Sequence, residues 1–272
     1  MIIDMHTHIF PVEVAKKAIP KLAKTIALAP SMDGTADGLL DSMARAGVDL
    51  SIILPTVTNP KQFDSIIRFA DSINAQEYPK NGPRLFSIAG IHPDMPDYKE
   101  KLTQIYNMGF QGIKIHPDYQ GVFFDDIRYM RILDKTSELG LFTLTHAGYD
   151  PYSPEQVHCS APRIRRVLDE VAPKNLILAH MGNNEFYDES EELLVGQDVY
   201  FDTAYSICHM EKEQLFRMIK NHGVHRILFG SDAPWGDQKE AVSILNSLPL
   251  TPQEQEQIFW KNAAALLNLS LS

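Results

Sequence analysis

The chain has 272 residues and a net charge of −10, from 25 basic and 35 acidic residues. This excess of acid repels nucleic acid and anionic membranes on average, so we expect neither as a partner. The hydrophobic fraction of 44% suffices for a large core, and the sequence has no apolar run of the roughly 20 residues that span a bilayer. The first residues do not resemble a signal peptide, and Cys159 and Cys208 lack the spacing of a disulfide framework or a metal site. We therefore expect a cytoplasmic protein.

Eight short segments rich in Ile, Leu, Val or Phe are the predicted strands. In chain order they are residues 1–8, 50–54, 85–91, 112–116, 141–146, 176–180, 199–202 and 227–231. Strands that are buried on both faces of a parallel sheet have this composition.

Longer amphipathic segments separate these strands and are predicted helices. They are residues 39–46, 63–77, 127–139, 162–171, 215–222, 240–248 and 252–269. Three of them stop at a glycine, which is a common residue after the last helical turn. Regular alternation of strand and helix predicts a parallel sheet. Eight such units in this length predict one closed (β/α)8 barrel, a single domain over residues 1–272.

Six of the ten histidines fall where a predicted strand ends, and one aspartate follows the last strand. They are His6, His8, His92, His116, His146 and His180, together with Asp232. In a parallel barrel these ends open on one face, and that face carries the active site. Of these histidines, we expect only His92 to be a hydrogen-bonded loop residue, because its loop continues through Pro93 and Pro96 and offers no further candidate ligand.

His6 and His8 are two residues apart, a spacing that places both side chains on the same side of a strand. Imidazole suits zinc and similar divalent metals, and a carboxylate adds a hard ligand. Several histidines and one aspartate at one barrel mouth therefore predict a metal site.

The same residues resemble a known family. The matching runs are Asp4-Met5-His6-Thr7-His8, His146-Ala147-Gly148, Leu178-Ala179-His180-Met181-Gly182 and Phe229-Gly230-Ser231-Asp232-Ala233-Pro234-Trp235. They are similar to the amidohydrolase superfamily, and most to the amidohydrolase-related branch that includes aminocarboxymuconate semialdehyde decarboxylase. The resemblance runs from Asp4 to the last helix.

The resemblance implies a role for each matched residue. His6, His8, His146 and Asp232 would bind the metal, and Asp232 would also take a proton from the water bound to it. His180 would polarise the substrate or shuttle a proton. We expect zinc as the metal, while manganese and a second ion stay open. The resemblance also implies a small-molecule substrate and a homodimer.

The fourth predicted strand is the ambiguous part of the site. Lys114 and His116 are two apart and should face inward. Lys114 would be a carboxylated lysine between two metals, a contact for a substrate carboxylate or a member of a buried ion pair. His116 would orient substrate, add a ligand or simply be a hydrogen-bonded strand-end residue. Trp235 is a candidate for substrate binding, and Asp4 and Asp202 are candidates to fix a histidine tautomer.

Three functions follow from this site. The first is hydrolysis of an amide, lactone or ester bond in a small molecule, by a water that the metal activates. The second is non-oxidative decarboxylation of a small aromatic or unsaturated carboxylic acid, which the same branch performs with nearly the same ligands. The third is a barrel that binds metal or ligand without catalysis.

Overall fold

The computed structural model describes residues 1–80 and 82–269, and within it the chain forms two compact units. The first unit contains Met1–Leu54, Asp71–Ser87 and the chain from Asp202 onward, and the second contains Pro55–Ala70 and Ile88–Phe201. That residues 1–272 form a single domain stays a prediction.

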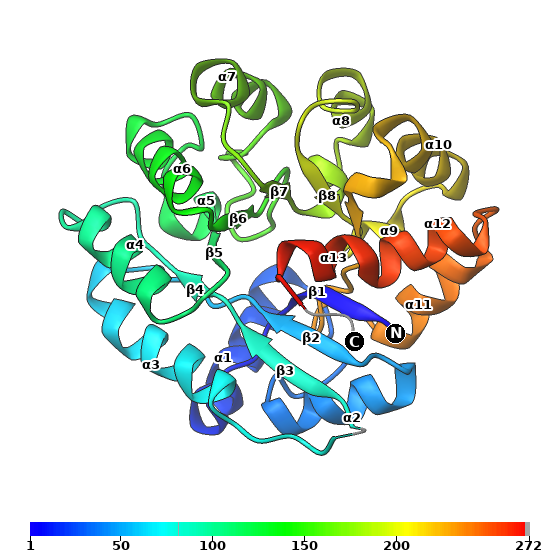
Figure 1. Ribbon diagram of the computed structural model, residues 1–272, viewed down its shortest axis with the longest axis horizontal. Coiled ribbons are helices and arrows are strands. Elements are labelled where there is room, and N and C mark those ends of the chain that lie inside the picture. Colours follow the sequence, from blue (N-terminus) through cyan, green and yellow to red (C-terminus); the bar gives the residue numbers. More distant parts are fainter. Residues whose placement is uncertain (81, 270–272) are drawn as a thin grey trace. The chain divides into compact units, whose positions relative to one another are not determined.

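The first unit contains a parallel three-stranded sheet in the order β1, β2, β3 (Figure 1). Its strands are β1 (Ile3–Thr7), β2 (Leu50–Ile53) and β3 (Arg84–Ser87). The short strand β9 (Ile227–Leu228) belongs to the same unit, and the N–H of Met5 donates to the carbonyl of Phe229 at 2.9 Å. This hydrogen bond places β1 beside the chain that follows β9, which is how His6 comes near Asp232.

The helices of the first unit follow its strands. They are α1 (Val12–Ile26), α2 (Ala36–Ala46), α9 (Ser206–His209), α10 (Lys212–His222), α11 (Gln238–Ser247), α12 (Pro252–Glu256) and α13 (Asn262–Leu266). Local sequence sets the ends of α2. The Oγ1 of Thr35 accepts the N–H of Gly38 at 3.1 Å, and Gly47 ends the helix with φ +73°.

The second unit contains parallel strands in the order β4, β5, β6, β7, β8. They are β4 (Ala89–Gly90), β5 (Gly112–Ile115), β6 (Phe142–Thr145), β7 (Leu176–Leu178) and β8 (Tyr200–Asp202), whose last residue is counted with the first unit. Strands β5, β6 and β7 are buried along their whole length, as expected for a sheet covered on both faces.

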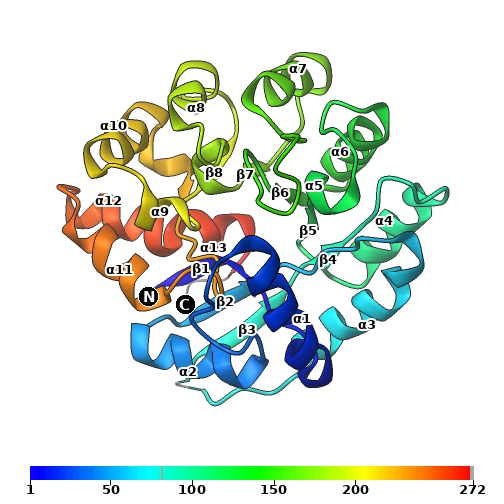
Figure 2. The ribbon, with the colours of Figure 1, turned by 180° about the vertical axis from the view of Figure 1, so that it is seen from behind.

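Helices accompany these strands in chain order (Figure 2). They are α3 (Phe63–Asn74), whose last turn belongs to the first unit, α4 (Tyr98–Asn107), α5 (Pro117–Gln120), α6 (Ile127–Leu139), α7 (Ala161–Val171) and α8 (Tyr187–Leu193). Helix α4 packs against α6, α6 against α7, and α7 against α8.

All eight predicted strands are present, with one difference. The predicted strand 85–91 is two strands, β3 and β4, separated at the buried residue Ile88. Among the described residues no helix is long and apolar enough to cross a membrane.

Candidate metal centre

Three side chains of the first unit converge at the end of β1. The Nε2 atoms of His6 and His8 each lie 3.3 Å from Oδ1 of Asp232. We call His6, His8 and Asp232 the strand-one cluster, and its donor atoms all lie within 4.8 Å of one another. The period of two along a strand, which predicted that His6 and His8 face the same side, explains their convergence.

The other ring nitrogen of each histidine, Nδ1, is hydrogen-bonded to an oxygen acceptor. Nδ1 of His6 lies 2.8 Å from Oδ2 of Asp202, and both side chains are fully buried. Nδ1 of His8 lies 3.2 Å from the carbonyl oxygen of Leu54. A carbonyl or an ionised carboxylate only accepts, so each Nδ1 carries a proton, and in the neutral imidazole each Nε2 then presents a lone pair to Asp232. The prediction that Asp202 contacts a histidine ring is confirmed.

Asp4 does not contact a histidine ring, and that alternative is wrong. Its carboxylate accepts the backbone N–H of His6 at 3.1 Å and also binds Ser231 and Gln238. Burial raises the pKa of Asp4 to about 6, although these hydrogen bonds lower it. The carboxylate therefore ties β1 to the turn that carries Asp232.

The strand-one cluster has the composition and geometry of a cation site. With neutral rings, two imidazole lone pairs and a carboxylate oxygen meet here, and a cation bound among them removes their mutual repulsion. Zinc binds imidazole nitrogen and carboxylate oxygen at about 2.0–2.2 Å, and adjacent ligands about 3.3 Å apart are compatible with such distances. His6, His8 and Asp232 therefore fit a divalent metal.

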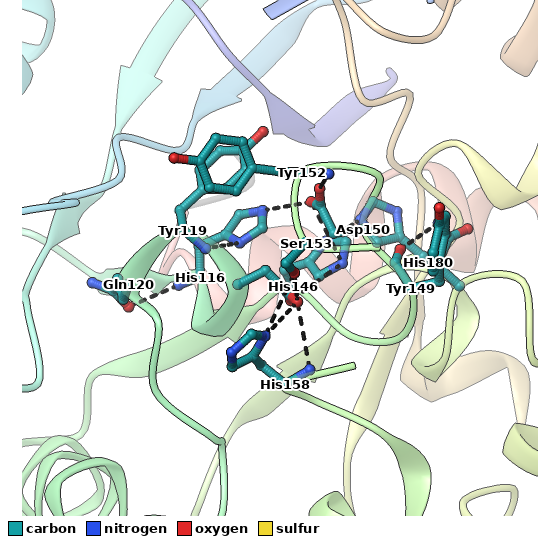
Figure 3. Close-up of polar contacts among 12 residues, drawn as sticks. His116, Tyr119, Gln120, His146, Tyr149, Asp150, Tyr152, Ser153, His158 and His180 are labelled. Carbon is teal, nitrogen blue, oxygen red and sulfur yellow. Dashed lines mark hydrogen bonds and ion pairs between the residues drawn. The ribbon is translucent and has the colours of Figure 1, made fainter. Parts of the chain in front are cut away.

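The second unit has its own group of polar side chains, His116, His146, Asp150 and His180, which we call the His146 network (Figure 3). Nδ1 of His146 lies 3.0 Å from Nε2 of His180. Oδ2 of Asp150 lies 3.4 Å from Nε2 of His116 and 3.8 Å from Nε2 of His146. The rings of His116 and His146 are stacked with centroids 4.4 Å apart.

His116 differs from His6 and His8 in its tautomer. Its Nδ1 accepts the N–H of Tyr119 at 3.4 Å, which caps the start of α5. A neutral His116 therefore carries its proton on Nε2 and donates it toward Asp150. Although the donor atoms of His116, His146 and Asp150 lie within 4.8 Å of one another, this tautomer suits a hydrogen-bonded network better than a cation site.

Backbone geometry explains how the loop after β6 is built. Gly148 has φ +92° and pairs with Cys159 and Asn184, and a Cβ atom there would lie 1.9 Å from the nitrogen of Asn184. Only glycine satisfies this contact. The loop then continues to Asp150, which meets His116 and His146.

The remaining predicted site residues have the following positions. Lys114 is buried on β5. Trp235 is partly buried, and its backbone N–H donates to the carbonyl of Asp232 at 2.7 Å. His92 is buried and its Nδ1 accepts the N–H of Asp94, as expected for a structural residue. His146 belongs to the second unit, so its sharing of an ion with the strand-one cluster stays a prediction.

Sequence reasoning missed several residues of these sites. They are Asp118, Asp150 and His158 in the second unit, and Ser231 and Gln238 in the first. Asp118 accepts from His158 Nδ1 at 2.9 Å and from Ser153 Oγ at 2.5 Å. Only Asp118 belongs to a visible pattern: the dipeptide Pro-Asp follows His116, as it also follows His92 (Pro93-Asp94).

Solved structures with the same fold are similar to this chain over nearly its whole length. A 2,6-dihydroxybenzoate decarboxylase from Rhizobium has a TM-score of 0.71 at 19% identity, with 98% of both chains covered. An uncharacterised TIM-barrel protein from Bordetella bronchiseptica has a TM-score of 0.75 at 16% identity, with 98% of both chains covered. A 5-carboxyvanillate decarboxylase from Novosphingobium aromaticivorans, complexed with manganese, has a TM-score of 0.73 at 15% identity, covering 99% of this chain and 96% of that one. The (β/α)8 barrel is therefore the fold of this chain.

A comparison with curated proteins finds no match. The family model described as amidohydrolase matches residues 3–269, a span that includes every residue of the strand-one cluster. The resemblance seen in the sequence is thus confirmed, and the chain belongs to the amidohydrolase family.

Proposed function

We propose that this protein is a metal-dependent decarboxylase, which releases carbon dioxide without oxidation from a small aromatic or unsaturated carboxylic acid. The observation that carries the metal site is the convergence of two Nε2 lone pairs and Oδ1 of Asp232, each Nδ1 being held by Asp202 or by the Leu54 carbonyl. The choice of decarboxylation is supported by the similar structures, two of which are decarboxylases of hydroxylated benzoic acids. Hydrolysis, the function expected first from the sequence, becomes the second candidate.

A divalent ion bound by His6, His8 and Asp232 would supply a Lewis acid that binds substrate oxygens and stabilises negative charge. We propose manganese or zinc as this ion, and manganese first, since the 5-carboxyvanillate decarboxylase was solved with it. We also propose that His146 completes the ligand set.

The chain itself must supply a proton. When the bond between the ring carbon and the carboxylate breaks, its electron pair stays on the ring carbon and carbon dioxide leaves. That carbon then takes a proton, so the product carries hydrogen where the substrate carried the carboxylate. We assign this transfer to Asp232, whose side chain is 11% exposed at the end of the strand-one cluster. Its carboxyl group would take the proton from solvent water before the bond breaks, and would be an ionised carboxylate again once the proton is on the ring carbon. His180, hydrogen-bonded to His146, is the second candidate to hold it.

Substrate contacts are proposed for Lys114, His116 and Trp235. A buried ammonium such as that of Lys114 suits a carboxylate, and an indole such as that of Trp235 suits a planar ring. Trp235 lies three residues beyond Asp232 and is joined to it by a backbone hydrogen bond, so it belongs to the same turn.

Turnover of a substrate panel tests the proposal. Purified protein loaded with Mn²⁺ or Zn²⁺ is incubated with 2,6-dihydroxybenzoate, 5-carboxyvanillate and related acids, and carbon dioxide release is measured. A second panel contains amides, lactones and esters. We expect release from at least one acid, abolished by chelation and in the variant His8→Ala. Hydrolysis of the second panel with every acid left intact would contradict decarboxylation and support the second candidate.

A further inference from the structure

The carboxylate of Asp4 joins three segments of the first unit. Its Oδ1 accepts the backbone N–H of His6 at 3.1 Å and that of Ser231 at 3.0 Å. Its Oδ2 accepts the hydroxyl of Ser231 at 2.5 Å and Nε2 of Gln238 at 2.8 Å. The side chain is 0% exposed, so these four hydrogen bonds form away from competing water.

Two hydrogen bonds of the Ser231 hydroxyl control the chain on both sides of Asp232. The hydroxyl of Ser231 donates to Asp4 and accepts the N–H of Ala233 at 3.1 Å. The residue before Asp232 and the residue after it are therefore both oriented by the same hydroxyl, which Asp4 holds in place.

The turn at Asp232 needs such restraint. Asp232 has φ +69°, in the left-handed region of backbone conformation that residues other than glycine rarely adopt. A residue in this region persists only where the surrounding structure over-determines it. The N–H of Asp232 also donates to the carbonyl of His6 at 2.9 Å, so the backbones of the two proposed ligands are joined directly.

We propose that Asp4 is a positioning residue that sets the divalent-metal affinity of the strand-one cluster, by holding the turn in which Asp232 meets His6 and His8. The inference rests on the metal site of the proposed function and is independent of the reaction catalysed there. Residues that orient metal ligands typically change metal affinity by about 10–100-fold when replaced.

The variant Asp4→Asn removes this restraint with little change in volume. An asparagine keeps one acceptor oxygen and replaces the other by an NH₂ group, which only donates. If the NH₂ group takes the place of Oδ2, it faces the Ser231 hydroxyl and Gln238 Nε2, both of which donate to Asp4. If it takes the place of Oδ1, it faces the N–H groups of His6 and Ser231 instead.

Two further variants complete the experiment. Ser231→Ala removes the hydroxyl that links Asp4 to Ala233 and leaves the carboxylate in place. Ser51→Ala is the matched control. Ser51 is buried on β2 and accepts from Gln238 Nε2 at 3.1 Å, so it belongs to the same network, but its hydroxyl bonds to Gln238 and to neither Ser231 nor Ala233. Metal-free protein of each variant is titrated with Mn²⁺, and the free ion is followed by electron paramagnetic resonance. Melting temperatures of the metal-free proteins are measured in parallel.

We expect the Kd for Mn²⁺ to rise about 10-fold or more in Asp4→Asn and in Ser231→Ala, and to stay within about twofold of wild type in Ser51→Ala. In the double variant Asp4→Asn/Ser231→Ala, the Kd for Mn²⁺ should rise by less than the product of the two single fold-changes, because both substitutions act through the hydrogen bond between Asp4 and Ser231. A wild-type Kd in folded Asp4→Asn and Ser231→Ala, with only the melting temperature lowered, would show a merely structural role and overturn the proposal. Loss of folding in both variants would overturn it as well.

This experiment separates failure of the inference from failure of the proposed function. If the variants lose Mn²⁺ affinity but wild-type protein releases carbon dioxide from no acid, the positioning role stands and the decarboxylase assignment fails. If wild-type protein binds no Mn²⁺, the metal site and the inference both fail. If wild-type protein is an active decarboxylase and the variants bind Mn²⁺ normally, only the inference fails.

Discussion

The hydrogen bond between His6 and Asp202 should control how well His6 binds a metal. Asp202 Oδ2 accepts Nδ1–H of His6 at 2.8 Å, and Asp202 Oδ1 accepts the N–H of Ala204 at 3.1 Å. In the variant Asp202→Asn, one of these acceptors becomes an NH₂ group. If the NH₂ group faces His6, the imidazole moves its proton to Nε2 and loses the lone pair that points at Asp232.

The size of this effect follows from the burial of the pair. His6 and Asp202 are 1% and 0% exposed, so solvent does not screen or replace the lost hydrogen bond. We expect metal affinity to fall by about 10–100-fold, which corresponds to about 1.4–2.7 kcal/mol of binding free energy. Loss of a hydrogen bond to a buried charged group should also lower the free energy of unfolding by about 1.5–3 kcal/mol.

The assay compares Mn²⁺ affinity and urea unfolding of wild type, Asp202→Asn and the control Thr203→Val. The control removes the buried hydroxyl that bonds with the backbone of Gly230, immediately beside Asp202, and does not touch the ring of His6. It should lose stability and keep its Mn²⁺ affinity. If Asp202→Asn is folded and binds Mn²⁺ as tightly as wild type, the tautomer argument is refuted.

The structure also predicts the direction of change in four further variants. His8→Ala should lose metal and turnover together, whereas Asp232→Asn should stay folded with little turnover; metal content and kcat check both, and a wild-type kcat in Asp232→Asn would exclude its proton-transfer role. Hydrogen bonds from Arg128 lower the pKa of Asp126 to about 2, so this pair stabilises the protein above about pH 4 and ceases to do so as pH falls through about 2. Arg128→Met should therefore lower the unfolding free energy by about 0.2–1 kcal/mol at pH 7 and by nothing measurable near pH 2, and an equal loss at both values would refute the linkage. Gly148→Ala should cost about 3 kcal/mol or more in urea unfolding, because its Cβ would meet Asn184; a stable variant would contradict the geometry of this loop.

The strands could be predicted because burial on both faces selects continuous Ile, Leu and Val runs. The break at Ile88 could not be predicted, since Ser87 is the only polar residue from Leu85 to Ile91, and what ends at Ile88 is the pairing with the neighbouring strand. Helix α1 was missed because Pro20 lies inside it, and proline usually marks a helix end. Helices α4 and α8 begin without a side-chain cap, so no capping residue marked their start. Helices α5 and α9 have four residues each, too few to show a helical period.

The strand-one cluster could be predicted because period two and strand-end position are properties of the sequence. Its partners are less visible. The acceptor for His8 is a backbone carbonyl, that of Leu54, which any residue would provide. Asp4 reaches Ser231 across 227 positions, and which atoms meet depends on the register of β1 against the chain after β9. The sequence therefore indicated that Asp4 has a role near the histidines, and only the fold shows that it binds a turn instead of a ring.

Anomalous diffraction from crystals grown with Mn²⁺ tests the central claim most directly, because it locates the ion without reference to activity. We predict one strong peak about 2.0–2.3 Å from His6 Nε2, His8 Nε2 and Asp232 Oδ1. Density for Mn²⁺ elsewhere, with these three atoms occupied only by solvent, would contradict the assignment of the site and the chemistry built on it.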